Sequence, residues 1–384
     1  MHFFSLLRIN RKKISLFKYF LKVIISPEEF KRFPTTRYQG SKRKILPWIY
    51  EVLKDIEFNT VLDACGGTGS VSYLFKKMGK AVTYNDHLFF NYQIGKALIE
   101  NSKNQLLPED IQGLIIKKPN TIYSSFISSN FEDIYYKKKE NEWLDITVKN
   151  IITMNHYKPN ILQYKKALAF YALFQACLIK RPFNLFHRKN LNLRLAEVKR
   201  NFGNKTSWEK EFSVYLPQFA NEINGTIFNS KILCIAKNES IFDIDPNGYD
   251  LVYIDPPYIN KNGSSESSNY MKCYHFLEGL SRYYEWENLI DLTSINKRFK
   301  NSVHDDRFNK DAIKKSIEEI IYKFRKSKIV FSYKKGGVPS IDFIKKSLEK
   351  HKNKVYTVSK EYKYALNKQN SNSNTNREVL IIGI

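Results

Sequence analysis

The stretch TVLDACGGTGSVSYLFKKMGKAVTYND, residues 60–86, predicts the fold of the chain. Apolar runs at 60–64 and 81–84 read as strands, and the segment 70–78 between them reads as a helix that Gly79 caps. Strand, helix and strand in this order form one βαβ unit of a parallel sheet. A helical segment at 89–100 continues the alternation, so a doubly wound α/β sheet is favoured.

The turn between the first strand and its helix contains Gly67 and Gly69, where a backbone without Cβ atoms lets a ligand approach closely. Neither common phosphate motif fits, because Ser72 replaces the third glycine of GxGxxG and no GK[ST] ending is present. The pattern DxxxGxG, which begins at Asp63, precedes a strand that ends in Asp86. This arrangement suits a nucleoside such as S-adenosylmethionine, whose ribose hydroxyls need a carboxylate acceptor. A plain βα turn is the alternative.

Another strand ends abruptly in the stretch DLVYIDPPYINKNG, residues 250–263. Residues 251–254 read as a strand that is apolar on both faces, as in parallel sheets. Pro256 and Pro257 each lack a backbone donor and fix φ, so they hold the Asp255 carboxylate and the Tyr258 ring rigidly where the strand ends. Ligands bind at this edge of open α/β sheets. A strand cap followed by a proline turn is the alternative.

The charge of the chain indicates a nucleic-acid partner. Lys and Arg total 63 against 38 Asp and Glu, which gives a formal net charge of +25 over 384 residues. The excess is local: residues 1–44 hold twelve basic and two acidic residues, and residues 178–210 hold nine and two. A genome rich in lysine codons would also raise the total.

The four cysteines lie far apart and show no zinc or disulfide spacing, which predicts a reducing, cytoplasmic setting and no metal site. Residues 1–34 mix apolar and basic residues, without an uncharged run long enough to span a membrane and without a cleavage site. We read this segment as a basic helical extension. A membrane-surface helix is the alternative.

The sequence divides into four predicted parts. They are a basic N-terminal extension (1–34), a cofactor-binding half of the catalytic domain (35–104), an insertion with helical character (105–229), and a catalytic half that completes the sheet (230–384). Further strands are predicted at 231–236, 328–333, 355–359 and 378–384, and the polar segment 371–376 reads as a mobile hairpin tip.

The order RYQGSK (37–42), DACGGTG (63–69), YND (84–86), a long insertion and then DPPY (255–258) resembles the DNA adenine-N6 methyltransferases of the alpha motif order, which include the Dam-like methylases. The match covers roughly residues 35–384. The resemblance implies a Rossmann-like, S-adenosylmethionine-dependent sheet with a mostly helical target-recognition insertion. It also implies methylation of adenine N6 in double-stranded DNA, in a restriction-modification setting with a possible partner endonuclease. We expect a monomer or weak dimer.

The resemblance assigns roles to individual residues. Tyr38 would contact the methionine end of the cofactor through its ring, and Lys42 would contact the methionine carboxylate. The full set of expected cofactor residues is Tyr38, Gly40, Lys42, Asp63, Gly67, Gly69, Asp86, Asn238 and Asp255. Asn238 departs from the aspartate expected there, and an ordinary polar turn residue is the alternative.

The catalytic residues would be Asp255, Pro256, Pro257 and Tyr258. The exocyclic nitrogen of adenine is a poor nucleophile, because its lone pair is delocalised into the ring. If the Asp255 carboxylate and the Pro256 carbonyl each accept one of its hydrogens, the lone pair turns toward the methyl group. Tyr258 would stack on the base, which must first be flipped out of the duplex.

The insertion contains a basic and aromatic stretch, LIKRPFNLFHRKNLNLRLAEVKR, residues 178–200. The basic residues expected to contact DNA are Arg181, Arg188, Lys189, Arg194 and Arg200. Three asparagines, at 184, 190 and 192, could read adenine. An amphipathic helix with a solvated face is the alternative.

Three rival functions are compatible with parts of the pattern. Methylation of cytosine N4 uses the same geometry, but that group more often has serine in place of Asp255. RNA base methyltransferases also contain DPPY, but the long basic insertion fits duplex readout better. A noncatalytic DNA-binding subunit is the alternative from a different class, and the intact glycine turn and DPPY argue against it.

Overall fold

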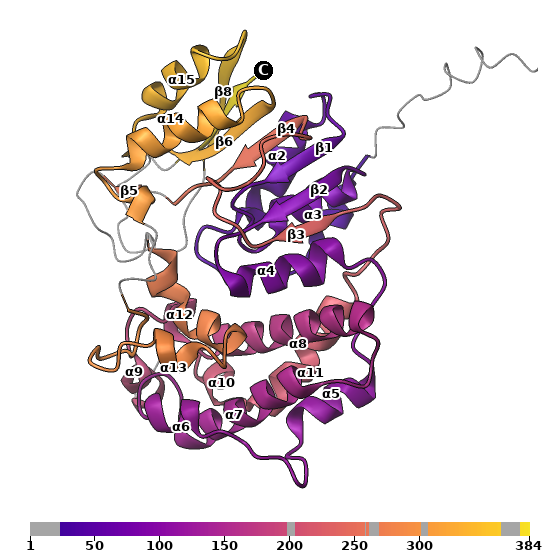
Figure 1. Ribbon diagram of the computed structural model, residues 1–384, viewed down its shortest axis with the longest axis vertical. Helices are drawn as coiled ribbons and strands as arrows, with labels where there is room; N and C mark the ends of the chain where they lie inside the picture. The colour runs from indigo at the N-terminus through magenta and orange to yellow at the C-terminus, as the bar shows by residue number, and fades with distance from the viewer. Residues whose placement is uncertain (1–23, 198–203, 258, 261–268, 301–305, 362–376) are drawn as a thin grey trace, which may run out of the picture.

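The computed structural model of the protein describes residues 24–197, 204–257, 259–260, 269–300, 306–361 and 377–384 (Figure 1). A sheet with helices on both faces lies at one end of the molecule, and a layer of helices lies at the other. The predicted hairpin tip at 371–376 and residues 1–23 of the N-terminal extension lie outside the described residues.

The seven strands of the main sheet are β1 (Thr60–Asp63), β2 (Ala81–Asn85), β3 (Ile235–Lys237), β4 (Leu251–Ile254), β6 (Lys328–Lys334), β8 (Val355–Glu361) and β9 (Arg377–Gly383). Their order is β3-β2-β1-β4-β6-β9-β8. Neighbouring strands from β3 to β6 are parallel, whereas β9 runs antiparallel between β6 and β8. The predicted α/β sheet is therefore confirmed. β3 starts later than predicted, at Ile235, because only three of its residues pair with β2.

The two faces of the sheet are covered by different helices, as the alternation of side chains along a strand requires. Leu62, Val252 and Ile329 point to a core shared with α14 (Ile313–Lys323) and α15 (Ile341–Glu349). Val61 and Tyr253 point to the opposite core, which contains α2 (Leu46–Leu53) and α3 (Ser70–Lys77). Because both faces are buried, the strands read as continuous apolar runs.

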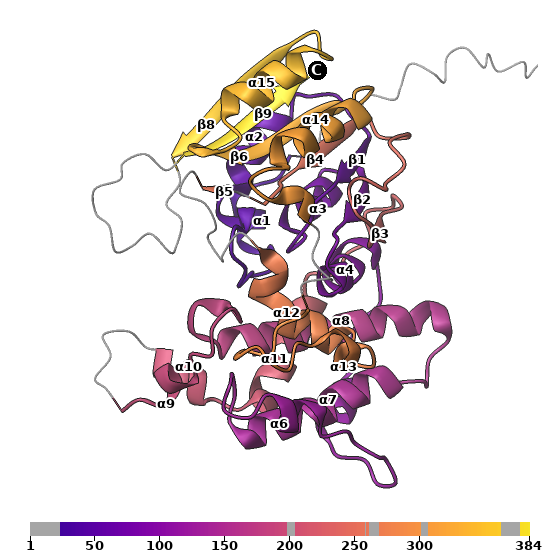
Figure 2. The same ribbon diagram turned by 60° about the vertical axis from the view of Figure 1, so that its left-hand side comes forward.

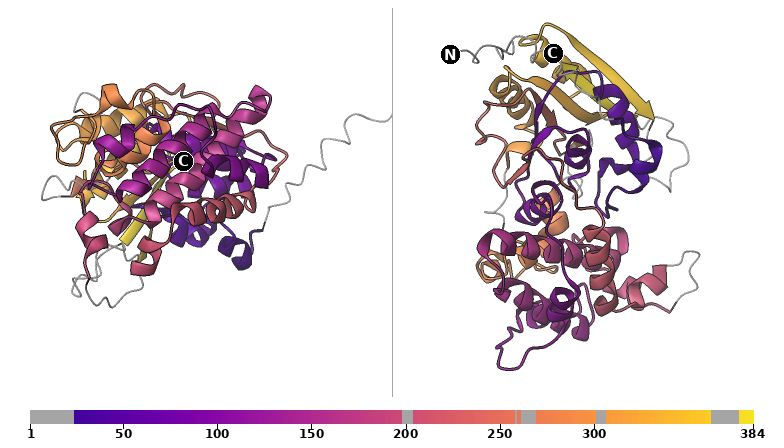
Figure 3. Two further views of the ribbon diagram at one scale, coloured as in Figure 1. Left: turned by 90° about the horizontal axis from the view of Figure 1, so that it is seen from below. Right: turned by 90° about the vertical axis from the view of Figure 1, so that its right-hand side faces the viewer.

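The helical layer lies beyond α4 (Phe89–Gly95) and the π-helical turn Lys96–Glu100 (Figure 3). Its helices within the insertion are α5 (Pro108–Ile115), α6 (Phe126–Asn130), α7 (Lys138–Thr153), α8 (Pro159–Ile179), α9 (Leu191–Leu195), α10 (Asn204–Glu209) and α11 (Phe212–Asn224). The long helix α8 is apolar on nearly all sides and largely buried, and it lies on the side of this layer that faces α4.

The helical layer also contains residues from outside the insertion, which the sequence division places in the catalytic half. These are α12 (Tyr270–Ser281) and α13 (Trp286–Leu289). The ring centroids of Phe276 and Trp286 lie 5.0 and 4.9 Å from that of Phe131, and Phe276 stacks on Phe186 at 5.1 Å. A single boundary at residue 230 therefore does not separate the two layers, because aromatic packing joins 270–299 to the insertion.

Small elements complete the chain. α1 (Pro27–Lys31) and a 3₁₀ turn (Lys42–Ile45) precede α2, and further 3₁₀ turns lie at Pro182–Asn184 and Asp306–Phe308. β5 (Ile259–Asn260) and β7 (Gly337–Val338) form a separate antiparallel pair. In the part of the chain that the structure describes, no helix is both long and apolar enough to cross a membrane.

Candidate active site

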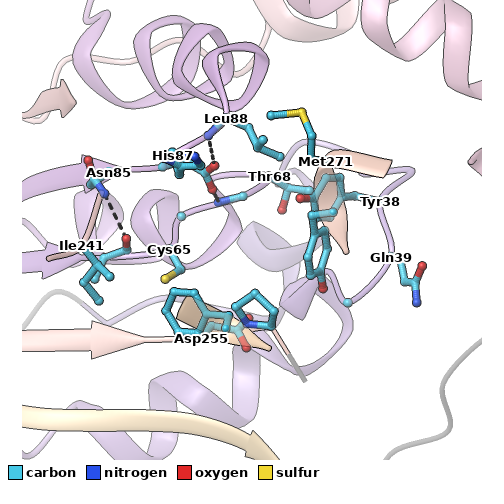
Figure 4. Close-up of a pocket in the computed structure, with 18 of the residues that line it drawn as sticks. Tyr38, Gln39, Cys65, Thr68, Asn85, His87, Leu88, Ile241, Asp255 and Met271 are labelled. Carbon is cyan, nitrogen blue, oxygen red and sulfur yellow. Dashed lines mark hydrogen bonds between the residues drawn. The ribbon is translucent and has the colours of Figure 1, made fainter. Parts of the chain in front are cut away.

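A cavity of about 560 Å³ opens at the edge of the sheet where the parallel strands end. Its walls come from the ends of β1, β2 and β4, from the turn after β3, and from 38–42, 269–272 and 308–311. In Figure 4, Ile241 and Cys65 lie on one side of the cavity and Tyr38 and Gln39 on the other. The glycine-rich turn, the end of the strand that leads to Asp86, and the segment that contains Asp255 therefore meet in one cavity.

The backbone of the glycine-rich turn packs closely against the ring of Tyr84, the fourth residue of β2. A Cβ atom added at Gly66 would lie 2.2 Å from this ring, so only glycine fits there. Gly67 has φ of 49°, in the left-handed region, and its carbonyl accepts a hydrogen bond of 2.7 Å from the Tyr84 hydroxyl. Gly66 and Gly67 line the cavity with their backbone. Gly69 instead precedes α3 and does not line the cavity.

Asp86 closes the turn from the end of β2. Its carboxylate accepts hydrogen bonds from the backbone of Gly67 at 2.8 Å and of Leu88 at 2.9 Å (Figure 4). Burial raises the pKa of Asp86, and these hydrogen bonds oppose the rise. Asp86 thus holds the shape of two cavity-lining segments and itself borders the cavity.

Asp63 lies at the end of β1, on the floor of the cavity. It is buried and accepts a hydrogen bond of 2.7 Å from the Ser72 hydroxyl. Burial, helped by the nearby charges of Asp255 and Asp86, raises the pKa of Asp63 to about 7, although the bond from Ser72 opposes this. Ser72, which breaks the dinucleotide motif in the sequence, therefore orients the first acid of the site.

Asp255 follows β4 and forms an ion pair with Lys42. The Lys42 ammonium lies 2.9 Å from Oδ1 and 2.7 Å from Oδ2 of Asp255, and 3.5 Å from Oε1 of Glu378. Burial alone would lower the pKa of Lys42, but the charges of Asp255 and Glu378 outweigh it and raise the pKa. The structure pairs the Lys42 ammonium with Asp255 and places Lys42 in the lining of the cavity, so its contact with the carboxylate of a bound cofactor stays a prediction.

Tyr38 forms one wall of the cavity as part of a stack of three tyrosines. Its ring lies parallel to that of Tyr274 at 4.4 Å and to that of Tyr270 at 5.5 Å, both from α12. The Tyr38 hydroxyl accepts a hydrogen bond of 3.3 Å from the Asn91 side chain. Gly40, with φ of 81°, also lines the cavity.

Of three other predicted residues, two do not line the cavity and one lies outside the described residues. Asn238 does not line the cavity, because its amide donates to the backbone carbonyls of Asp86 at 2.8 Å and His87 at 3.0 Å. Pro256 is buried and does not line the cavity, whereas Pro257 does. Tyr258 lies outside the described residues.

Sequence reasoning missed several residues that line the cavity. Leu88 and Ile241 are apolar residues that come two positions after Asp86 and three after Asn238, and that spacing after a strand could have indicated them. The segments 269–272 and 308–311 carry no such signal, because their place depends on how α12 and α14 pack. Glu278 was also missed: this buried residue of α12 accepts from the first two backbone N–H groups of α4, at 3.1 and 2.9 Å.

The basic stretch of the insertion divides into buried and exposed cations. Arg181 is buried and donates to the backbone carbonyls of Leu185, Arg188 and Lys189 at 3.1, 2.6 and 2.8 Å. Arg194 is buried and donates to Glu140 at 2.8 Å. The predicted contact of these two arginines with DNA is therefore not supported, since their guanidinium groups are enclosed by protein.

The remaining cations of this stretch are placed differently. Arg188 and Lys189 are exposed, and Arg200 lies outside the described residues. The loop that carries Arg188 and Lys189 is fixed by the buried Arg181 and also presents Phe183, whose side chain is 64% exposed and whose φ is 62°. A surface loop with an exposed ring and two cations is a suitable contact for nucleic acid.

Comparisons with known proteins relate the chain to one family. A family model described as D12 class N6 adenine-specific DNA methyltransferase matches residues 38–329. The type II methyltransferase M2.HphI of Haemophilus parahaemolyticus is 31% identical over 253 residues, which are 64% of this chain and 71% of that protein. The modification methylase StsI of Streptococcus sanguinis is 27% identical over 79% of this chain and 44% of that protein.

A third relative, the type II methyltransferase M.FokI of Planomicrobium okeanokoites, is 26% identical over 64% of this chain and 37% of that protein. The chain thus spans less than half the length of the StsI and FokI methylases and about seven tenths of M2.HphI.

Proposed function

The chain belongs to the D12 class N6 adenine-specific DNA methyltransferases, and we propose that it methylates adenine in duplex DNA with S-adenosylmethionine as donor, in the cavity at the edge of the sheet. The observation that carries this proposal is the meeting of Asp255 with Asp86 and the glycine-rich turn in one cavity. The two halves of the reaction, donor binding and base orientation, have their residues within the same space.

The residues of the cavity fit the donor. Asp86 offers a carboxylate to ribose hydroxyls, the apolar side chains of Leu88 and Ile241 suit the faces of a purine, and the backbone of Gly67 permits close approach. Lys42 is bound to Asp255, so we assign the methionine end of the donor to the cavity wall around Tyr38 and not to that ammonium. When bound, S-adenosylmethionine supplies a methyl group on a sulfonium sulfur.

Asp255 orients the nucleophile in the proposed mechanism. A flipped adenine that enters the cavity would donate one hydrogen of its amino group to the Asp255 carboxylate, and this fixes the direction of the nitrogen lone pair. The side chain of Asp255 is 20% exposed, which leaves it accessible from the cavity although Lys42 contacts both of its oxygens. Pro256 and Pro257, the two residues after Asp255, restrict the backbone there.

The names of the relatives indicate a biological setting. They are called type II methyltransferases and a modification methylase, and we propose that this chain likewise modifies DNA in a restriction-modification context. Sequencing DNA from cells that express the chain, with a method that reports modified adenines, tests the function. Recurrent N6-methyladenine at one sequence supports it, whereas modified cytosine or unmodified DNA contradicts it.

We expect Asp86→Ala to weaken binding of S-adenosylmethionine about tenfold or more. The reason is that a hydrogen-bonding partner with a charge contributes about 1.5–3 kcal/mol. Isothermal calorimetry of the folded variant measures the effect, and Asp86→Asn, which keeps one acceptor oxygen, should lose less. An affinity equal to that of the wild type in both variants would remove Asp86 from the proposed donor site.

We expect the double variant Arg188→Ala, Lys189→Ala to flatten the salt dependence of DNA binding. Each phosphate contact that is lost should reduce the slope of log affinity against log salt by about 0.9. The matched control is Lys345→Ala with Lys350→Ala, two exposed lysines at α15, which lies at the end of the molecule away from the helical layer. Equal slopes for both double variants would place the DNA surface elsewhere.

A further inference from the structure

Glu378, the second residue of β9, is a buried carboxylate to which neither the family motifs nor the proposed mechanism gives a role. Its side chain is fully buried, and its Oε1 accepts a hydrogen bond of 2.7 Å from the Ser332 hydroxyl of β6. The same oxygen lies 3.5 Å from the ammonium of Lys42. A buried charge of this kind is costly unless it is paired.

The sheet topology explains how Glu378 reaches the active site. β9 is antiparallel to β6, and β6 is parallel to β4. The first residues of β9 therefore lie at the edge where β4 ends: Ile254 pairs with Phe331, and Glu378 pairs three residues further along β6, with Lys334. An antiparallel last strand thus brings a carboxylate to the edge where Asp255 lies.

One cation, Lys42, lies between two carboxylates. Its ammonium is closest to Asp255, at 2.7 and 2.9 Å, and its side chain is only 5% exposed. Beside Lys42 alone, the negative charge of Asp255 would be drawn toward the ammonium, and Asp255 would accept a hydrogen less readily from a third group. A second carboxylate, that of Glu378 at 3.5 Å from the ammonium, offsets that pull.

We propose that Glu378 is a positioning residue for methyl transfer, which acts through Lys42 to keep the Asp255 carboxylate oriented and basic. This inference rests on the proposed function of the cavity. It gives a reason for burying Lys42 together with the carboxylates of Asp255 and Glu378, since replacement of buried ion networks by apolar residues often costs no stability.

The chemistry of the reaction requires a basic acceptor. The adenine amino nitrogen forms the new N–C bond as the C–S bond of the donor breaks with its electron pair staying on sulfur, and the nitrogen then releases one proton. Asp255 is the acceptor nearest to this proton in the proposed geometry. Its ability to accept depends on the charges around it, and among the described residues the groups that act on it include Lys42, Glu378, Asp63, Cys65, Tyr253 and Tyr270.

The test compares Glu378→Gln with the wild type and with Glu361→Gln. Glu361 is an exposed carboxylate at the end of β8 that pairs with Arg377, the residue before Glu378, so the control changes the same functional group nearby. The measurements are single-turnover methyl transfer to duplex DNA from pH 5 to 9, the affinity for S-adenosylhomocysteine, and the affinity for DNA. Folding is checked by circular dichroism.

For Glu378→Gln we expect the transfer rate to fall about tenfold or more, as for the loss of a partner with a charge. The acid limb of the pH–rate profile should move to lower pH. The reason is that Asp255 binds a proton less tightly once the charge of Glu378 no longer offsets that of the Lys42 ammonium. Both binding affinities should change less than threefold. Ser332→Ala, which removes a hydrogen bond and no charge, should lower the rate less and leave the acid limb in place.

A folded Glu378→Gln enzyme with the wild-type rate and the wild-type acid limb overturns the inference. If that variant does not fold, Ser332→Ala decides, and an unchanged rate for it overturns the inference as well. A wild-type enzyme that transfers no methyl group to adenine contradicts the proposed function itself. Active wild type with unaffected variants contradicts the role of Glu378 alone.

Discussion

Asp255→Ala should reduce methyl transfer to duplex DNA at least about a hundredfold, the effect of deleting one preorganised hydrogen-bond partner of a reacting group. Asp255 is the acidic residue at the end of β4, and its carboxylate borders the cavity. Single-turnover transfer with saturating donor and DNA measures the chemical step. Affinity for S-adenosylmethionine should change much less than the rate, since donor contacts are distributed over several other segments of the cavity.

Two further variants make this experiment specific. Asp255→Asn keeps the size of the side chain and one acceptor oxygen but loses the charge that pairs with Lys42, so we expect a loss between those of the wild type and Asp255→Ala. Asp245→Ala removes an exposed carboxylate ten residues earlier, which accepts hydrogen bonds from the backbone and side-chain amides of Asn247, and should leave transfer unchanged. Near-normal transfer by folded Asp255→Ala would show that the chemistry lies elsewhere.

Arg181→Met should lower the free energy of unfolding by about 3 kcal/mol or more. The buried guanidinium donates to three backbone carbonyls of one loop, and each acceptor left unsatisfied costs about 1–3 kcal/mol. The guanidinium carbon, Cζ, lies 4.5 and 5.3 Å from the ring centres of Tyr135 and Phe186, so the substitution also removes the packing of the guanidinium on these rings. Burial lowers the pKa of Arg181 to about 10. This value is still above physiological pH, so the guanidinium remains charged.

Urea unfolding measures the stability of this variant. The control is Lys189→Met, eight residues later on the same loop, which should change stability by no more than about 0.5 kcal/mol because the side chain is exposed. A stable Arg181→Met protein whose affinity for DNA falls as far as that of the Arg188, Lys189 double variant would restore the direct contact with DNA that the sequence suggests.

The sequence identifies the parts of the site that depend on local chain geometry. A strand that ends in an acid, a glycine-rich turn, and an acid at the end of the next strand are properties of short segments, and in a parallel sheet all three must meet at one edge. Asp63, Gly67, Asp86 and Asp255 therefore lie around one cavity, as the order of motifs indicates. The family resemblance, drawn from the same motifs, is confirmed by the family match.

The helical layer includes residues beyond position 230 for a long-range reason. The segment that contains α12 follows the catalytic motif in the chain, but its aromatic side chains bury themselves against Phe131 and Phe186 of the insertion. Apolar periodicity indicates that one face of a helix or strand will be buried, but it does not indicate which other element will cover that face.

The basic stretch gives the clearest contrast between sequence and structure. Arg181 and Lys189 are both cations of one short loop and carry the same charge in the sequence. The first folds inward and holds the loop together, and the second lies on the surface. Which cation is buried depends on whether the surrounding carbonyls and rings can replace water around it, and those groups come from residues far apart in the chain.

Glu378 and Lys42 show the same division at the active site. By itself, the sequence determined the strands, the turn between them and the acids at their ends, because backbone geometry and side-chain periodicity act within a few residues. Only the tertiary structure decided that an ammonium from residue 42 lies between carboxylates from residues 255 and 378. The physical reason is that a buried charge is stable only beside its partners, and the partners are assembled by strand order and register across the whole sheet.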